Sequence, residues 1–236
     1  MKNTLALTLL LCISGAAALA AAKSKEAERL ENATYVINEI METPENGIPL
    51  DLLNRAVCVG IVPGEKKGAF IVGGSFGRGA LVCRTHGTGS WGAPSMFTIV
   101  GGSYGLQIGG QSTDVVFIVM NSGGARKLLQ SGVKLGADAS AAAGPVGRDA
   151  KAETDVQLHA EILTYSRSRG LFAGISLAGS VIRQDEDGNE RLYGHAVTAK
   201  DVLLRDKVPA PAAAKPLDDI LTKWSPRGGE AFVDAG

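Results

Sequence analysis

Aromatic residues are scarce in this sequence, and neither sign of charge is in excess. Phenylalanine, tryptophan and tyrosine make up 5% of the 236 residues, while apolar residues in total make up 45%. Small aliphatic side chains and glycine must therefore fill much of the core. Lysine plus arginine and aspartate plus glutamate both total 24, so no net positive charge attracts the chain to nucleic acid. We expect no nucleic-acid partner.

Long apolar runs are absent beyond the N-terminus. The run within MKNTLALTLLLCISGAAALAAAKSK follows a single lysine, is short for a membrane span and ends in small residues. These features are typical of a secretory leader with an Ala-x-Ala cleavage site. We therefore expect residues 1–22 to be a signal peptide and the protein to be exported, either periplasmic or associated with the outer membrane. Residues 23–207 have the length of one domain, and 208–236 read as a Pro/Ala linker, a short helix and a tail.

Cysteine is also rare, with three residues in the whole chain. Cys12 lies in the leader, so Cys58 and Cys83 remain after its removal. Their spacing is not that of a metal site, and an oxidising compartment permits a disulfide between them. Two buried thiols are the alternative. We expect no metal and no cofactor.

The distribution of apolar residues predicts an α+β fold. Apolar residues repeat at threes and fours over residues 24–43, which indicates an amphipathic N-terminal helix. Short runs rich in valine and isoleucine follow, separated by turn residues, as in an antiparallel meander. With 31 glycines, the chain is expected to form a mainly antiparallel, glycine-rich β barrel or sandwich-like sheet with short peripheral helices. We also expect a strand over 155–166, a turn over 183–190 and a last helix over 217–224.

Two copies of one motif raise the question of catalysis. IVGGSFG at 71–77 and IVGGSYG at 99–105 both fit Gly-x-Ser-x-Gly, the pattern of a hydrolase nucleophile elbow. An elbow needs a helix directly after the serine, but both Ser75 and Ser103 are followed by further strand-like sequence. The glycines are better explained as places where strands bend and approach closely. A serine hydrolase acting through Ser75 is therefore a minor alternative, and we expect no enzyme.

One basic cluster suggests a binding surface. Lys66 and Lys67 lie at a predicted hairpin tip, Arg78 and Arg84 lie on a nearby predicted strand, and Trp91 lies in a neighbouring turn. Cations beside an exposed tryptophan suit the surface of an anionic membrane. The alternative is an ordinary charged turn without a ligand.

Four stretches of the sequence resemble the SYLF family of lipid-binding domains. They are CVGIVPGEKKGAFIVGGSFGRGALVCR, FTIVGGSYGLQIGGQSTDVVFIVMN, KLLQSGVKLGADASAAAGPVGR and AEILTYSRSRGLFAGISLAGSVI, which together cover most of residues 50–200. The resemblance implies a glycine-rich β structure that binds phosphoinositides or other anionic lipids without catalysis. Some eukaryotic members act in actin assembly and use an N-terminal amphipathic helix to engage membranes.

Two features of this chain depart from the eukaryotic members. Its leader is of a bacterial type, which argues against phosphoinositides and actin as natural partners. Its N-terminal helix holds more glutamates than basic residues over 23–43, the opposite of a helix that binds an anionic surface. We therefore expect an exported protein that binds anionic phospholipid. The alternative is a periplasmic structural or protein-interaction module.

Overall fold

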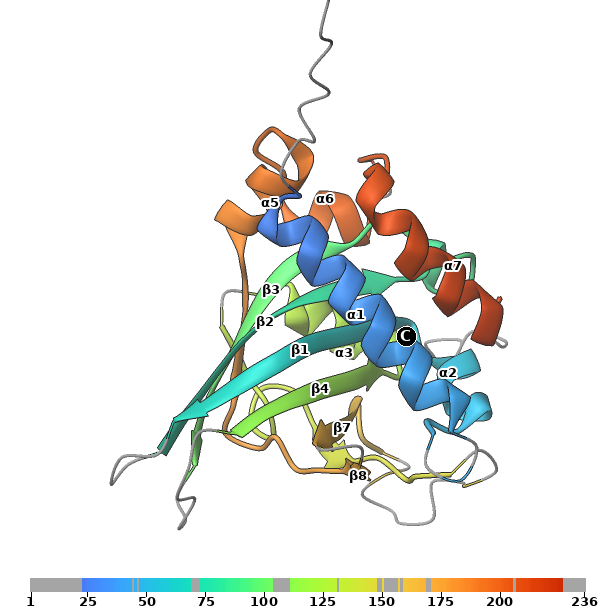
Figure 1. Ribbon diagram of the computed structural model, residues 1–236, viewed down its shortest axis with the longest axis vertical. Helices are drawn as coiled ribbons and strands as arrows, with labels where there is room; N and C mark the ends of the chain where they lie inside the picture. Colours follow the sequence, from blue (N-terminus) through green and yellow to red (C-terminus); the bar gives the residue numbers. More distant parts are fainter. Residues whose placement is uncertain are drawn as a thin grey trace, which may run out of the picture.

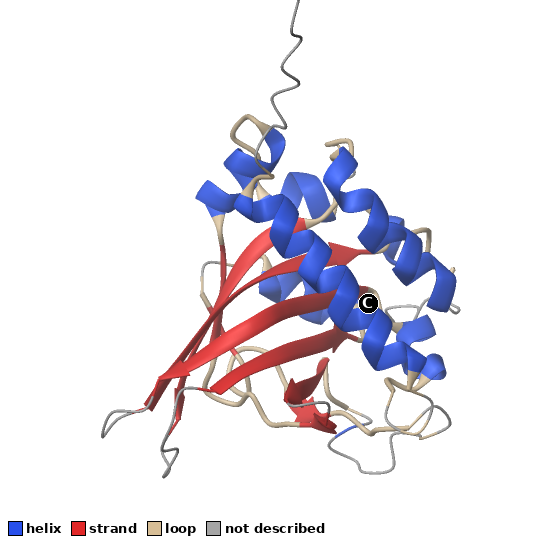
Figure 2. Ribbon diagram, viewed as in Figure 1, coloured by secondary structure: helices blue, strands red, loops and turns tan. Residues whose placement is uncertain are grey.

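The computed structural model describes residues 23–226, except 44, 46, 69–72, 104–110, 131, 148–149, 151–156, 158, 169–170 and 206. The predicted signal peptide and the last ten residues lie outside this range. The chain forms a curled, mostly antiparallel sheet with helices on both of its faces (Figure 1, Figure 2). The predicted α+β class is confirmed. The described strands form an open, half-barrel-like sheet, because their order has two ends.

The sheet holds nine strands in the order β5-β9-β3-β2-β1-β4-β7-β6, with β8 also paired to β7. Only β6 pairs in parallel among the described strands. The strands are β1 (Cys58–Gly68), β2 (Gly73–Cys83), β3 (Ser95–Ser103), β4 (Gln111–Val119), β5 (Val133–Lys134), β6 (Ala141–Ala143), β7 (Ile162–Ser168), β8 (Leu171–Gly174) and β9 (Val181–Gln184). The helices are α1 (Lys25–Glu42), α2 (Leu50–Arg55), α3 (Ser122–Leu128), α5 (Glu186–Tyr193), α6 (Ala199–Leu203) and α7 (Lys215–Trp224), with short 3₁₀ turns at Thr85–Gly87 and Ala212–Ala214.

Helix α1 lies across one face of the sheet, as its sequence predicts (Figure 1). The Ser24 hydroxyl accepts a hydrogen bond from the Ala27 N–H and so caps the first turn. The apolar residues that repeat at threes and fours are all buried: Leu30, Ala33, Ile37, Ile40 and Met41. The helix therefore covers the β core with its apolar face, which leaves its acidic face toward solvent.

Alternation along the strands separates two apolar cores. Val59 and Ile61 of β1 pack with α1, α2 and α7, whereas Cys58 and Val62 pack with α3 and α6 on the opposite face. Both cores lie near the same end of the long strands. As a result, the helices cover that end, and the other ends of β1, β2 and β3 extend past them at the lower left of Figure 1.

Glycine has a specific packing role in the centre of the sheet. Gly60 and Gly79 lie directly opposite Phe117 and Phe97 on the neighbouring strands. A Cβ atom on Gly60 would lie 2.1 Å from the Phe117 ring, and one on Gly79 would lie 2.6 Å from the Phe97 ring. The two rings pack edge to face, with centroids 5.4 Å apart. These glycines make room for two of the few aromatic rings, inside strands rather than at bends.

Two local expectations were wrong. Strand β7 begins at Ile162, because residues 157, 159 and 160 are not extended. The segment expected to be a turn forms the end of β9 and helix α5, whose N-terminus is capped by Asp185 and whose C-terminus ends at Gly194 with φ 76°. The expected last helix is confirmed as α7, and its Leu217 and Leu221 belong to the same core as α1.

Candidate functional site

The exposed end of the long strands carries apolar side chains that no helix covers. Phe76 of β2 is 47% exposed and Val100 of β3 is 44% exposed, and the two are directly paired in the sheet. Val181 of β9 is paired with Val100 and is partly exposed. Directly paired residues point to the same face, so these three side chains form one band, here called the apolar row. It lies on the face that α1 covers further along the strands.

A second band runs parallel to the apolar row, two residues nearer the helices. Arg78 is paired with Thr98, and Thr98 is paired with Arg183. Both arginines are exposed, and Thr98 is half-buried between them. We call these three residues the arginine row. Lys134 of β5 flanks the apolar row, since it is paired with Val181 and is exposed.

These cations lack counter-charges within the described part of the chain. None of the three, Arg78, Arg183 or Lys134, forms an ion pair with a described carboxylate. The Arg78 guanidinium instead lies 5.8 Å from the centre of the Phe76 ring. Exposed positive charge beside exposed apolar surface is the combination that an anionic membrane surface attracts.

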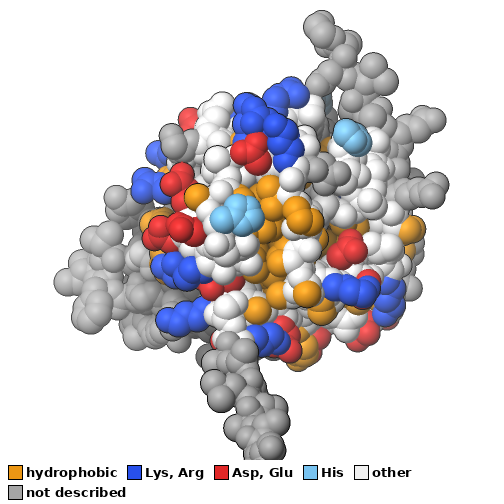
Figure 3. Space-filling view, turned by 90° about the horizontal axis from the view of Figure 1, so that it is seen from above, with side chains coloured by type: hydrophobic (Ala, Val, Ile, Leu, Met, Phe, Trp, Pro, Cys, Tyr) orange, Lys and Arg blue, Asp and Glu red, His pale blue; other side chains and the backbone are white. Residues whose placement is uncertain are grey.

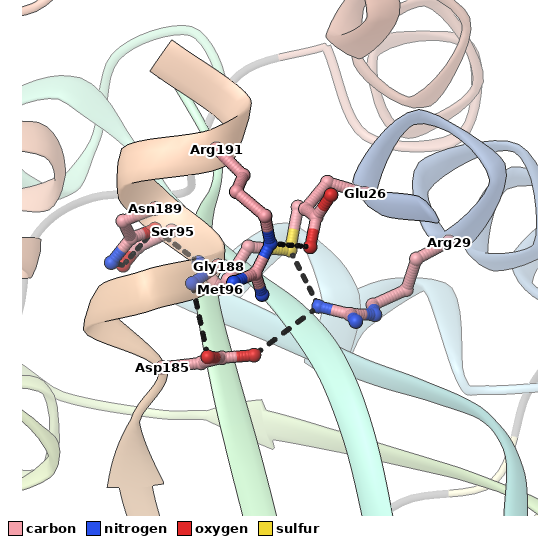
Figure 4. Close-up of polar contacts among 8 residues, drawn as sticks. All are labelled: Glu26, Arg29, Ser95, Met96, Asp185, Gly188, Asn189 and Arg191. Carbon is pink, nitrogen blue, oxygen red and sulfur yellow. Dashed lines mark hydrogen bonds and ion pairs between the residues drawn. The ribbon is translucent and has the colours of Figure 1, made fainter. Parts of the chain in front are cut away.

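A further guanidinium reaches this region from α1 (Figure 4). Arg29 NH1 lies 3.5 Å from Asp185 Oδ2 and 3.3 Å from the Met96 sulfur. Burial lowers the pKa of Arg29; attraction from Asp185 opposes this shift, and repulsion from Arg78 adds to it. The two guanidinium groups are therefore close enough to interact. The other carboxylate oxygen of Asp185 accepts the Gly188 N–H, so this acid is engaged on both sides.

The lysines of the predicted cluster have a backbone position at this same end. Lys66 is paired with Phe76 on one side and Ser112 on the other, and Lys67 is paired with Ser75 and Gln111. The side chains of both lysines lie outside the described residues. Their role in binding stays a prediction, and Arg78 is the member of the predicted cluster that the structure places on the exposed surface.

Arg84 and Trp91 were expected at this surface, and that expectation was wrong. Arg84 is 2% exposed and Trp91 is 5% exposed, and the Arg84 guanidinium carbon lies 3.9 Å from the centre of the Trp91 ring. The guanidinium donates to the carbonyl oxygens of Ala56 and Gly89 at 3.0 and 3.1 Å. It also donates to the Ser225 carbonyl and hydroxyl oxygens at 3.2 and 2.5 Å.

Arg84 is therefore a structural anchor at the helical end of the sheet. Its hydrogen bonds connect α2, the turn after β2 and the end of α7, and the Trp91 indole N–H donates to the Ser225 carbonyl at 3.0 Å. Burial lowers the pKa of Arg84 to about 10, so the group stays charged at neutral pH. Its donors are used inside the protein and are not offered to a ligand.

Ser75 lies inside β2 and not at a strand-to-helix turn. The two copies of the duplicated motif pair with each other, since Gly74 is opposite Gly102 and Ser75 is opposite Gly101. Residues after Ser75 continue as strand to Cys83, so no helix N-terminus is available to form an oxyanion hole there. The Ser103 side chain lies outside the described residues. Both serines lie in strands, rather than between strands as the sequence suggested.

The two cysteines within the described residues are joined. Cys58 and Cys83 form a disulfide between directly paired positions of β1 and β2, near the helical end of both strands. Both residues are buried. The bridge closes a loop with a sequence separation of 25 and so ties the ends of the hairpin that carries the predicted lysine tip.

The helical end of the molecule offers a different kind of surface. Figure 3 shows apolar side chains gathered near the middle of this face, with charged side chains around them. A shallow groove of about 540 Å³ lies between α1 and α7, with Tyr35, Pro216 and Ile220 among its lining residues. Among the described residues, no group of three or more His, Cys, Asp or Glu side chains is arranged for a metal ion. No described helix has the length and apolarity needed to cross a membrane.

Sequence reasoning missed much of the exposed strand surface. Arg183 was assigned to a turn, whereas it lies in β9. Phe76 and Val100 were treated as part of the glycine-rich motifs. The alternation of Val181 and Arg183 with buried Ile182 was the available signal for an exposed strand face. Their paired residues in β3 lie more than 80 positions away in the sequence, so the sequence did not show which side chains share that face.

Comparison with known proteins identifies relatives over most of the chain. A family model named Ysc84 and described as "Las17-binding protein actin regulator" matches residues 100–224. LAS seventeen-binding protein 3 of Saccharomyces cerevisiae is 36% identical over 177 residues, which are 74% of this chain and 38% of that protein. SH3 domain-containing YSC84-like protein 1 of Homo sapiens is 33% identical over 201 residues, which are 83% of this chain and 58% of that protein. The matched region thus spans about two fifths to three fifths of these relatives.

Proposed function

Since the chain belongs to the Ysc84 family, also known as the SYLF domain family, we propose that it binds anionic phospholipid at a membrane surface and catalyses no reaction. The observation that carries this proposal is the exposed end of the sheet. There, Phe76 and Val100 are exposed beside Arg78, Arg183 and Lys134, which have no described carboxylate partner. Membership of a lipid-binding domain family supports the class of ligand.

Simple magnitudes support this surface as the membrane contact. A basic side chain near an anionic membrane contributes about 1 kcal/mol, so three contribute about 3 kcal/mol. Burial of exposed Phe76 and Val100 in the interface adds apolar free energy at about 25 cal/mol per Å². Because the chain has no net charge, the attraction depends on this local grouping and must weaken as salt is added.

The lysine tip is the part of the proposal that a single pair of substitutions tests. The double variant Lys66→Glu, Lys67→Glu removes two attractions and adds two repulsions. It is expected to cost about 3–4 kcal/mol, a few hundredfold in affinity for phosphatidylglycerol vesicles in co-sedimentation. The matched control is Lys200→Glu, Lys207→Glu, which makes the same charge change at the exposed helical end. Equal loss in both variants would show that net charge, and not the tip, controls binding.

Export from the cytoplasm is a further part of the proposal, because a periplasmic location gives access to membrane surfaces rich in anionic phospholipid. Its support is the leader sequence, with Ala20 and Ala22 as candidate cleavage positions. N-terminal sequencing of protein from the native cell is expected to find a chain that starts at residue 21 or 23. An intact Met1, or a lipid on Cys12, would contradict this part.

A protein-interaction module is the second candidate. The observation in its favour is the α1–α7 groove, where Tyr35 is 57% exposed next to Ile220 and Pro216. The relatives' description as Las17-binding proteins also concerns protein partners. The two candidates differ in which variants matter: Tyr35→Ala is expected to leave vesicle binding unchanged, whereas a protein partner seated in this groove would lose affinity.

A further inference from the structure

In β2, β3 and β9, the exposed end of the sheet orders its polar and apolar groups along the strand direction, whereas Lys134 of β5 lies level with the apolar row. In β2, Arg78 and Phe76 are two residues apart and point to the same face. The rise of a strand is about 3.3 Å per residue, so the apolar row lies about 7 Å nearer the end of the sheet than the arginine row. The same order holds in β3, where Val100 lies nearer the end of the sheet than Thr98. It also holds in β9, which runs in the opposite direction, so that Val181 lies nearer the end than Arg183.

Across the strands, the arginine row places two long guanidinium side chains on one face of the sheet. Arg78 and Arg183 flank Thr98 on adjacent strands, and two strand spacings of about 4.8 Å separate their backbones by about 10 Å. Long guanidinium side chains can converge from this separation on one phosphate, where Arg forms paired hydrogen bonds. The Thr98 hydroxyl between them is a further donor. Arg29 of α1 is paired with Asp185 (Figure 4), so it is not counted among the unpaired cations of this subsite.

This order matches the depth profile of a membrane. Phospholipid phosphates lie in the polar layer, and acyl chains begin a few ångströms deeper, where interfacial apolar groups insert by about 5–10 Å. We infer that the domain docks with the exposed strand ends toward the membrane, that Arg78, Thr98 and Arg183 form a lipid-phosphate subsite, and that Phe76 and Val100 enter the layer beneath it. This inference rests on the proposed lipid-binding function and specifies its site and orientation.

The competing orientation places the helical face on the membrane. Tyr35 is the exposed apolar residue of α1 there, and two lysines of this face are already paired with acids. Lys23 pairs with Glu31 at 2.5 Å, and Lys215 pairs with Asp219 at 2.7 Å. Paired charges gain little from an anionic surface, since binding only exchanges one partner for another. At the strand end, the arginine row has no described carboxylate partner and lies beside the exposed apolar row, so this end is the favoured contact.

The first experiment tests the phosphate subsite. Wild type, Arg78→Gln/Arg183→Gln and the control Arg55→Gln/Arg205→Gln are titrated with vesicles of 30% phosphatidylglycerol in phosphatidylcholine. The control removes the same charge from two surface arginines that pair with Asp51 and Asp201 on helices α2 and α6. At about 1 kcal/mol per cation, the subsite variant is expected to bind about 30-fold more weakly. The control is expected to change by less than about threefold.

Equal losses in the subsite variant and the control would overturn the inference, because position would then not matter. If the wild type itself fails to bind these vesicles while remaining folded, the proposed lipid-binding function fails, and the inference fails with it. Binding by the wild type with no loss in Arg78→Gln/Arg183→Gln would overturn the subsite alone. Thermal unfolding of each variant, which is expected to match the wild type, separates loss of binding from loss of the fold.

The second experiment tests the orientation. Phe76→Trp and Tyr35→Trp each add one tryptophan at an exposed position, and vesicles with brominated acyl chains quench tryptophans that reach the acyl layer. The inference expects extra quenching in Phe76→Trp and none in Tyr35→Trp, each compared with the wild-type signal of Trp91 and Trp224. Quenching of Tyr35→Trp without Phe76→Trp would reverse the orientation while leaving lipid binding intact.

Discussion

Replacement of Arg84 by alanine is expected to destabilise the fold strongly without a direct effect on membrane binding. Arg84 is buried and donates four hydrogen bonds to three residues, Ala56, Gly89 and Ser225. The substitution removes the Arg84 donors from the Ala56 and Gly89 carbonyl oxygens and opens a space beside Trp91, whereas the Ser225 carbonyl keeps the indole N–H of Trp91. Each hydrogen bond from a charged donor is worth about 1.5–3 kcal/mol, and the space left behind adds a cavity term, so we expect a loss of about 3–5 kcal/mol. For a domain of this size, the melting temperature then falls by about 10–15 °C.

The matched variant is Arg78→Ala on the same strand. Arg78 is exposed and forms no ion pair with a described residue, so its removal is expected to change the unfolding free energy by less than about 0.5 kcal/mol. It is instead expected to weaken binding to phosphatidylglycerol vesicles about fivefold, from about 1 kcal/mol. One strand thus carries two arginines whose replacement affects different properties.

Urea unfolding followed by tryptophan fluorescence measures the stability of both variants, and vesicle co-sedimentation measures binding. Arg84→Lys adds a sharper test, since it keeps the charge but replaces the planar guanidinium with a single ammonium that cannot reach all of its acceptors. We expect Arg84→Lys to be destabilised and to keep its affinity for vesicles. An Arg84→Ala protein as stable as the wild type would refute the structural assignment of Arg84. If that stable protein also lost vesicle binding, Arg84 would instead belong to the binding surface.

Three further predictions concern the bridge, the acidic limit of stability and the serine motif. Thiol titration of the processed, denatured and unreduced protein should find no free thiol at Cys58 or Cys83, and reduction should lower the unfolding free energy by about 3.5 kcal/mol for a loop of this length. Burial, the largest single influence, raises the pKa of Glu26, but hydrogen bonds to its carboxylate and attraction from Arg191 and Arg29 together outweigh it, so the net pKa is lowered. This contribution to stability is complete above the ordinary glutamate pKa and is lost as the pH falls through the lower folded pKa, so the stability difference between the wild type and Glu26→Gln should shrink in acid. A fluorophosphonate probe should not label Ser75, and labelling that disappears in Ser75→Ala would contradict a non-catalytic site.

Local sequence patterns predict a helix or strand well where its buried face is set by residues close together in the sequence. The spacing of Leu30, Ala33 and Ile37 at intervals of three and four residues predicts the buried face of α1, because helix geometry alone sets that face. The end of β9 and helix α5 were less visible, although Asp185 and Gly194 are ordinary capping residues for α5. Their charged sequence resembled a turn, and the helix is stabilised by contacts with α1 and β3 that no local pattern contains.

The candidate site depends on pairing between distant strands, which a sequence does not display. Arg84 looked like a surface cation because its acceptors, such as Ala56 and Ser225, lie 28 and 141 positions away. Arg183 was missed as a site residue because its partner is also distant in the sequence. Its pairing with Thr98, which is in turn paired with Arg78, places both arginines on one face of the sheet. Charge can be read from a sequence, but whether a charged group is buried or exposed depends on the register of the sheet.

The relative affinity of the wild-type protein for anionic and neutral vesicles tests the central claim most directly. The measurement is the partition coefficient into 30% phosphatidylglycerol vesicles and into pure phosphatidylcholine vesicles at the same salt concentration. Three unpaired cations at the exposed strand end predict a preference for the anionic vesicles of about 100-fold at low salt, which falls as salt is added. Equal partitioning into both kinds of vesicle would contradict recognition of anionic lipid by this surface.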